Sequence, residues 1–146
     1  MLKPNAFNSI SIIVIFCLIF ISGCTDYDYD TPDTPANLDG FTRHLKMEVT
    51  SDVDSVYYYA DEMGSDVIYM LNFKCREQTV QNIIDQLNLN SFTQTYCGIT
   101  PRGDLSWWDN HNVLNLPGWS RRTDDYYRYL WYDQTRGHVY YLEFSM

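Results

Sequence analysis

Residues Tyr126–Phe144 read YYRYLWYDQTRGHVYYLEF, and this stretch decides the expected fold. Its two ends, Tyr126–Tyr132 and His138–Phe144, are rich in tyrosine and in other residues that favour strands. Between them lie the turn formers Asp133–Gly137, and Gly137 can adopt the left-handed backbone conformation that such turns need. The stretch therefore predicts a β-hairpin.

A second hairpin and a helix are predicted upstream. Val56–Ala60 is rich in tyrosine, Val67–Phe73 alternates apolar residues, and Asp61–Asp66 between them contains a glycine suited to a turn. Glu77–Asn88 then shows the spacing of an amphipathic helix, with one negative charge in its first turn. The apolar stripe of this helix is made of Val80, Ile83, Ile84 and Leu87.

These elements predict an α+β domain over residues 41–146. We expect a small, mainly antiparallel sheet of four strands, built from two β-hairpins, with one helix packed on a face. Residues 91–123 show no period and contain prolines, glycines and three tryptophans. A stretch of this length without regular structure is usually functional or is held by a constraint such as a disulfide.

The chain is acidic, with a formal net charge of −9 over 146 residues. A negative surface repels nucleic acid and anionic lipid headgroups. We therefore expect no nucleic-acid partner.

The amino-terminal segment has the pattern of an export signal. Lys3 is followed by an apolar run, Ile10–Ile21, which is shorter than the roughly 20 residues of a spanning helix. The run ends in Ile21-Ser22-Gly23-Cys24, which resembles the lipobox of bacterial lipoproteins. An uncleaved amino-terminal anchor is the alternative interpretation.

The resemblance to bacterial lipoproteins implies that residues 1–23 are a signal peptide and that Cys24 carries lipid. Acyl chains on Cys24 would anchor the protein stably in a membrane. Thr25, rather than aspartate, after the acylated cysteine implies the periplasmic face of the outer membrane. Residues 24–40, rich in acids, threonine and proline, are expected to be a flexible tether. Residues 53–144 also resemble, loosely, small bacterial lipoproteins for which no activity is known.

Two cysteines remain for the mature domain, Cys75 and Cys97. In an oxidising compartment they are expected to form a disulfide, which would contribute about 3 kcal/mol by closing a loop of roughly 20 residues. A metal site or a catalytic thiol is the rival interpretation, although no CxxC spacing or adjacent histidine supports it.

Nothing in the sequence indicates catalysis, a cofactor or a metal. His44, His111 and His138 lie in separate segments without ligand spacing, and no nucleophile or nucleotide-binding motif is present. Asp104 and Asp109 share a loop with His111 and could supply an acid and a base, but loop residues of these types are usually solvated. We expect a protein that is not an enzyme.

The aromatic content gives the best indication of function: 7 Phe, 13 Tyr and 4 Trp in one small chain. Exposed tyrosine and tryptophan favour binding, because they bring a large contact area at little entropic cost. We expect a protein partner in the cell envelope; a periplasmic immunity protein against a toxin, or a module that contacts glycan or peptidoglycan, is the alternative. These rings could also simply build the core. The candidate binding residues are Trp107, Trp108, Trp119, Tyr127, Tyr129 and Trp131.

Overall fold

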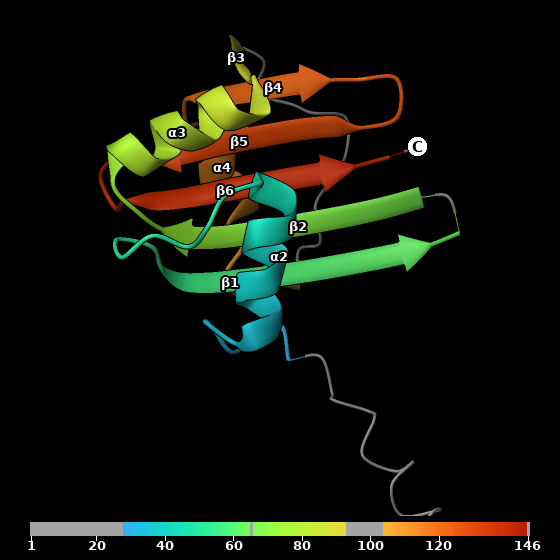
Figure 1. Cartoon of the computed structure of the whole chain (residues 1–146), viewed down its shortest axis with the longest axis horizontal. Helices are drawn as coiled ribbons and strands as arrows, with labels where there is room; N and C mark the ends of the chain where they lie inside the picture. The colour runs from blue at the N-terminus through green and yellow to red at the C-terminus, as the bar shows by residue number, and fades with distance from the viewer. Residues whose placement is uncertain (1–27, 65, 93–103, 146) are drawn as a thin grey trace, which may run out of the picture.

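A computed structural model describes residues 28–64, 66–92 and 104–145. These residues form an antiparallel sheet with the strand order β1-β2-β6-β5-β4-β3 (Figure 1). The strands are β1 (Asp54–Met63), β2 (Asp66–Lys74), β3 (Asn90–Phe92), β4 (Gly118–Arg122), β5 (Tyr127–Asp133) and β6 (His138–Phe144). The helices are α2 (Pro35–Leu45), α3 (Glu77–Leu87) and α4 (Asn110–Val113).

The predicted α+β fold, a small sheet of two hairpins with one packed helix, is wrong. The sheet has six strands, and only short helices accompany it, so the described chain is predominantly β. Strands β3 and β4 account for much of the difference. They have three and five residues, which is too short for an alternating pattern to stand out. They pair with each other, and β4 also pairs with β5, so they extend the sheet beyond the second hairpin.

Both predicted hairpins are present, as the pairs β1–β2 and β5–β6. Gly64 and Gly137 have φ angles of 66° and 70°, the left-handed conformation that glycine adopts without strain. In the second turn the Gly137 N–H donates to the Asp133 carbonyl at 2.8 Å. The Asp133 carboxylate also accepts the N–H groups of Thr135 and Arg136, so this turn is fixed from within.

Helix α3 buries the stripe that its sequence predicts. Val80, Ile83, Ile84 and Leu87 are all less than 8% exposed, and they join the hydrophobic core on one face of the sheet. The amino-terminal end of α3 is capped from a distance. Asp52 accepts the Arg76 N–H at 2.9 Å and the Thr79 hydroxyl at 2.8 Å.

Helix α2 begins inside the segment that the sequence analysis assigned to a tether, residues 24–40. Thr34 accepts the Asn37 N–H at 3.2 Å, and Pro35 occupies the first turn, which is the usual amino-terminal signature of a helix. The acidic, proline-containing composition concealed this signature. Because Asn37 and Gly40 are buried, the tether cannot extend to residue 40.

The residues before α2 are also attached to the domain. The Asp33 N–H donates to the Val56 carbonyl at 2.8 Å, and the Asp33 carboxylate accepts N–H groups from Ser55 and Val56. The Tyr29 carbonyl accepts the indole N–H of Trp107 at 2.8 Å. Residues 28–34 therefore run along the start of strand β1 rather than away from it.

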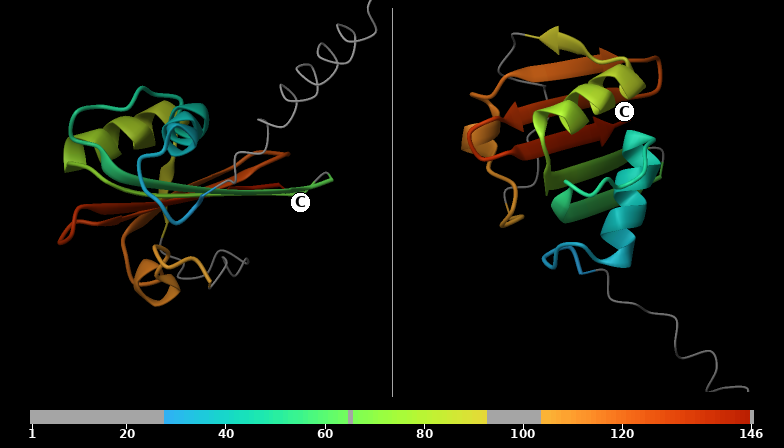
Figure 2. Two further views of the ribbon diagram at one scale, coloured as in Figure 1. Left: turned by 90° about the horizontal axis from the view of Figure 1, so that it is seen from below. Right: turned by 60° about the vertical axis from the view of Figure 1, so that its left-hand side comes forward.

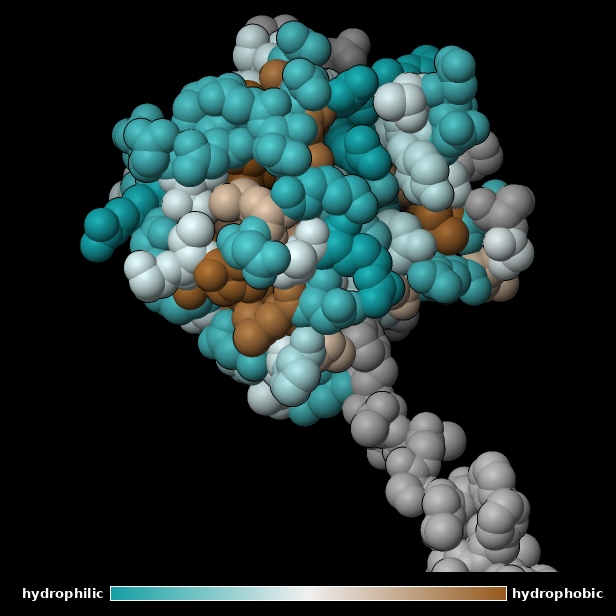
Figure 3. Space-filling model, viewed as in Figure 1, coloured by the Kyte–Doolittle hydropathy of each residue, from teal (hydrophilic) through white to brown (hydrophobic). Residues whose placement is uncertain are grey.

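The sheet separates two hydrophobic clusters. Figure 2 shows α2 and α3 on one side of the sheet, here called the helix side, and α4 with its neighbouring loops on the other, here called the second face. Phe41 of α2 meets Phe73 of β2 edge to face on the helix side, with ring centroids 4.9 Å apart. Trp108 and Trp131 lie in the cluster on the second face. Hydrophilic residues cover most of the helix side, with apolar residues visible between them (Figure 3).

We predict that Ile83→Ala lowers the free energy of unfolding by about 3 kcal/mol, because Ile83 is fully buried and the substitution leaves a cavity. Chemical denaturation followed by tryptophan fluorescence measures this loss. Gln81→Ala on the exposed side of the same helix is the matched control, with a change below about 0.5 kcal/mol. Equal losses in both variants would contradict the packing of α3 on the sheet.

Candidate functional site

The six candidate binding residues do not form one surface. Trp108 and Trp131 are 4% and 3% exposed and belong to the core of the second face. Trp108 meets Trp131 and Tyr140 edge to face, at centroid distances of 6.4 and 5.4 Å. These two tryptophans therefore stabilise the domain and are not available to a partner. Trp119 is half-buried against the helix-side cluster, on the opposite face of the sheet.

Trp107 is half-buried and already engaged by the domain. Its ring stacks on Tyr57, with centroids 5.5 Å apart and planes at 16°, and its indole N–H binds the Tyr29 carbonyl. This tryptophan holds Tyr29 against the second face. One side of its ring is therefore unavailable for stacking on a sugar.

Tyr127 and Tyr129 do share a surface on the second face, and both are half-buried. Tyr127 stacks on Phe144 at 4.9 Å and 8°, and Tyr129 stacks on Trp131 at 5.6 Å and 12°. Phe92 meets Tyr129 edge to face at 5.7 Å. The Arg122 guanidinium lies 4.9 Å from the centre of the Tyr127 ring, within the range of a cation–π contact.

We call this set of side chains the aromatic surface. It consists of Phe92, Arg122, Tyr127 and Tyr129. Phe92 and Arg122 were not predicted from the sequence, because their place beside the two tyrosines depends on the pairing of β3, β4 and β5.

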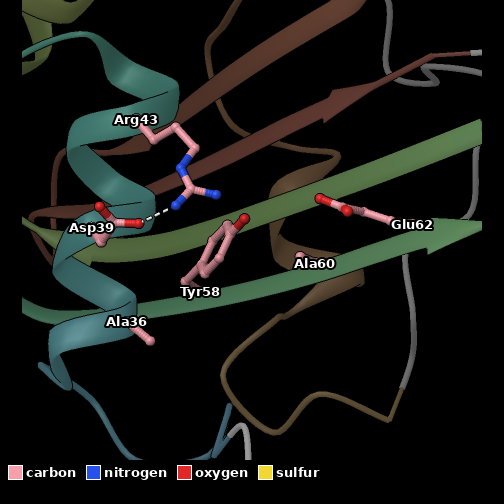
Figure 4. Close-up of a pocket in the computed structure, with 6 residues that line it drawn as sticks. All are labelled: Ala36, Asp39, Arg43, Tyr58, Ala60 and Glu62. Atoms are coloured by element: carbon pink, nitrogen blue, oxygen red, sulfur yellow. Dashed lines mark hydrogen bonds and ion pairs between the residues drawn. The ribbon is translucent and has the colours of Figure 1, made fainter.

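A second site lies on the helix side, in a cleft between α2 and β1 with a volume of about 510 Å³ (Figure 4). This α2–β1 cleft was not predicted from the sequence, because the first half of α2 lies in the segment expected to be a tether. Three alternate residues of β1 line the cleft, and the helical residues follow the spacing i, i+3, i+7. The lining residues are Ala36, Asp39, Arg43, Tyr58, Ala60 and Glu62.

A buried hydrogen-bond network lies beside the cleft. The ring nitrogens of His44 lie 3.1 Å from the Tyr58 hydroxyl and 3.4 Å from the Glu143 carboxylate. Glu143 also accepts the Tyr141 hydroxyl at 2.6 Å and the Arg128 guanidinium at 3.2 Å. This network ties α2 to three strands.

The electrostatics of this network favour fixed protonation states. Burial would raise the pKa of Glu143, but hydrogen bonds from His44, Tyr141 and Arg128 outweigh it and lower that pKa to about 2. Burial raises the pKa of Tyr58 to about 12. The carboxylate is therefore ionised and the phenol protonated at neutral pH. Nε2 of His44 faces the Tyr58 hydroxyl, and Nδ1 faces the Glu143 carboxylate.

Tyr58 can form hydrogen bonds in this arrangement, but its phenol is not a base at neutral pH. A phenol with a pKa near 12 does not lose its proton at neutral pH. Two of the loop residues considered above as an acid and a base have ordinary roles or surroundings. Asp109 caps α4 by accepting the Asn112 N–H at 3.0 Å, and His111 is exposed.

Within residues 28–64, 66–92 and 104–145, no three side chains of the metal-binding types come together. His138 lies 3.3 Å from the Asn72 amide oxygen, and burial lowers its pKa. In the same part of the chain, no helix has the length and apolar character needed to cross a membrane.

The predicted covalent features fall partly outside the structure. Cys75 is buried and has no disulfide partner among the described residues, and burial raises the pKa of its thiol to about 12. Cys97 lies outside the described residues, so the Cys75–Cys97 disulfide stays a prediction. Cys24, with the whole predicted signal peptide, also lies outside them.

Comparisons of the chain with protein-family models, with curated proteins and with solved structures gave no significant match. Function is therefore inferred from the geometry of the residues.

We predict that Glu143→Gln lowers the free energy of unfolding by about 3 kcal/mol, because it leaves the partly buried Arg128 without its counter-charge. The pKa of Glu143 is lower in the folded chain than its ordinary 4.5, so its stabilising effect is complete above that pH. The effect declines as the pH falls from 4.5 towards about 2.

Denaturation midpoints measured between neutral pH and pH 2 give both effects. The variant should lose part of the acid dependence seen in the unsubstituted protein. Glu48→Gln, at an exposed glutamate between α2 and β1, is the control and should change stability little. Unchanged stability in Glu143→Gln would show that the network contributes nothing.

Proposed function

We propose that this protein is a membrane-anchored lipoprotein of the cell envelope that binds a protein partner through the aromatic surface and is not an enzyme. The observation that carries the proposal is the stacking of Tyr127 and Tyr129, half-exposed themselves, on the buried rings of Phe144 and Trp131.

Such stacking suits a binding surface. A tyrosine held by a buried ring has little freedom left to lose when a partner arrives, so more of its contact energy becomes affinity. Tyrosine, tryptophan and arginine also dominate the residues on which binding energy concentrates. The aromatic surface combines two tyrosines with the exposed Arg122.

A protein partner agrees with this geometry better than a glycan does. Sugars stack on open tryptophan faces, but Trp108 and Trp131 are buried and Trp107 already stacks on Tyr57. An immunity protein against a toxin would be one form of the same proposal, with the toxin as the partner.

The lipid anchor is the second part of the proposal. Its support is the sequence Ile21-Ser22-Gly23-Cys24 after an apolar run, and Cys24 is the proposed site of acylation. The proposed location is the periplasmic face of the outer membrane, as the threonine after this cysteine implies.

Photo-crosslinking in cells tests the proposed surface. A photoreactive phenylalanine analogue at Tyr129 should give a discrete crosslinked protein, because this ring would lie inside the interface. Tyr127→Ala in the same chain should remove that product, whereas the analogue at Gln81 on exposed α3 should not give it. The same product from both positions, or its survival in Tyr127→Ala, would contradict binding at the aromatic surface.

Intact mass spectrometry of the protein from the membrane fraction tests the anchor. We expect a species that lacks residues 1–23, carries acyl mass and becomes heavier by two hydrogen atoms on reduction of Cys75–Cys97. Cys24→Ser should abolish the acyl mass and the processing. A full-length, unacylated species would rule out the anchor, and an unchanged mass on reduction would rule out the disulfide.

A further inference from the structure

The α2–β1 cleft holds two opposite charges that do not contact each other. Figure 4 shows the Arg43 guanidinium, from α2, and the Glu62 carboxylate, from β1, directed towards the space above the Tyr58 hydroxyl. No hydrogen bond or ion pair joins Arg43 to Glu62. The cleft on the helix side is separate from the aromatic surface on the second face.

Arg43 and Glu62 are each held by one neighbouring side chain, and each keeps other hydrogen-bonding atoms available to a ligand. Arg43 pairs with Asp39 one helical turn away, through one of its nitrogens, and its side chain remains 60% exposed. One oxygen of Glu62 accepts the Tyr69 hydroxyl at 2.9 Å. Both anchors leave the charged groups accessible from the cleft.

Tyr58 forms the floor of the cleft between the two charges, and its side chain is held rigidly. An added Cβ at Gly40 would lie 2.6 Å from the Tyr58 ring, so the ring packs directly on the backbone of α2. The Tyr58 hydroxyl is also fixed by His44 at 3.1 Å. Ala36 and Ala60 add short side chains that leave space above this floor.

We propose that the α2–β1 cleft binds a small zwitterion of the amino-acid type, with its carboxylate on Arg43, its ammonium group on Glu62 and its carbon chain over Tyr58. This proposal is independent of the partner that the aromatic surface binds.

The chemistry of the lining residues supports this ligand class. A guanidinium matches the geometry of a carboxylate and can donate two parallel hydrogen bonds to it. A carboxylate accepts hydrogen bonds from an ammonium group, and the aromatic face of tyrosine accommodates a short carbon chain. The volume of about 510 Å³ falls in the usual range for small-molecule sites.

A ligand with a single charge would fit less well. Exposed ion pairs contribute little when they act alone, because water screens them. A zwitterion makes both contacts at once. Each of its charged groups then lies beside a side chain of opposite charge. The relative spacing of the two charges should therefore determine affinity.

NMR titration of the ¹⁵N-labelled protein tests the proposal with glycine, β-alanine, 4-aminobutyrate and 6-aminohexanoate, in which the two charges lie progressively further apart. We expect one member to shift the amides of Tyr58, Ala60 and Glu62, with a Kd on the order of 1 mM. Acetate and ethylammonium, each carrying one of the two charges, should bind at least about tenfold more weakly.

Two substitutions and two controls complete the experiment. Arg43→Gln and Glu62→Gln should each weaken the best zwitterion about tenfold. Both side chains are exposed, and the spectrum itself reports whether the variant is folded. Arg76→Gln and Asp85→Asn, which remove exposed charges of each sign at α3, should leave affinity unchanged. The proposal is overturned if no zwitterion shifts these amides, if acetate or ethylammonium binds equally well, or if either cleft variant retains full affinity.

Discussion

Pairing of β6 with β2 on one side and with β5 on the other holds the two hairpins in one sheet. Glu143 lies opposite Tyr69 on β2 and opposite Arg128 on β5, and it also accepts a hydrogen bond from His44 on α2. This central strand is thus the last of the described strands in sequence order. Because its partners on β2 are distant in the sequence, the two hairpins cannot join into one sheet until β6 is available.

The two faces of this sheet have different chemistry. On the second face, rings stack in a continuous series from Arg122 through Tyr127 and Phe144 towards Trp131, so contact area and rigidity are its main properties. On the helix side, charged groups and hydroxyls surround the α2–β1 cleft. A single thin sheet can therefore carry two independent binding sites, because residues that alternate along β5 and β1 face opposite sides.

The hairpins and α3 were predictable because each repeats its apolar period over at least one full element. Helix α2 was not, since its acidic composition outweighed the short signal of Thr34 and Pro35. The cleft depends on α2 crossing β1, and no local pattern specifies that crossing. Alternate residues of a strand face the same side, and Tyr127, Tyr129 and Trp131 accordingly lie in one cluster on the second face. The burial of Trp131 was not foreseeable, because it depends on packing with the distant Trp108.

The attachment of residues 28–34 to strand β1 limits how such an anchored domain could lie on a membrane. An acylated Cys24 would be four residues from Asp28, and a fully extended chain of that length spans at most about 14 Å. The β1 edge would then face the bilayer, with the β3 edge directed away from it. The strands would lie roughly parallel to the lipid surface, and both faces of the sheet would stand roughly perpendicular to it. Partners would approach along the membrane plane rather than from above.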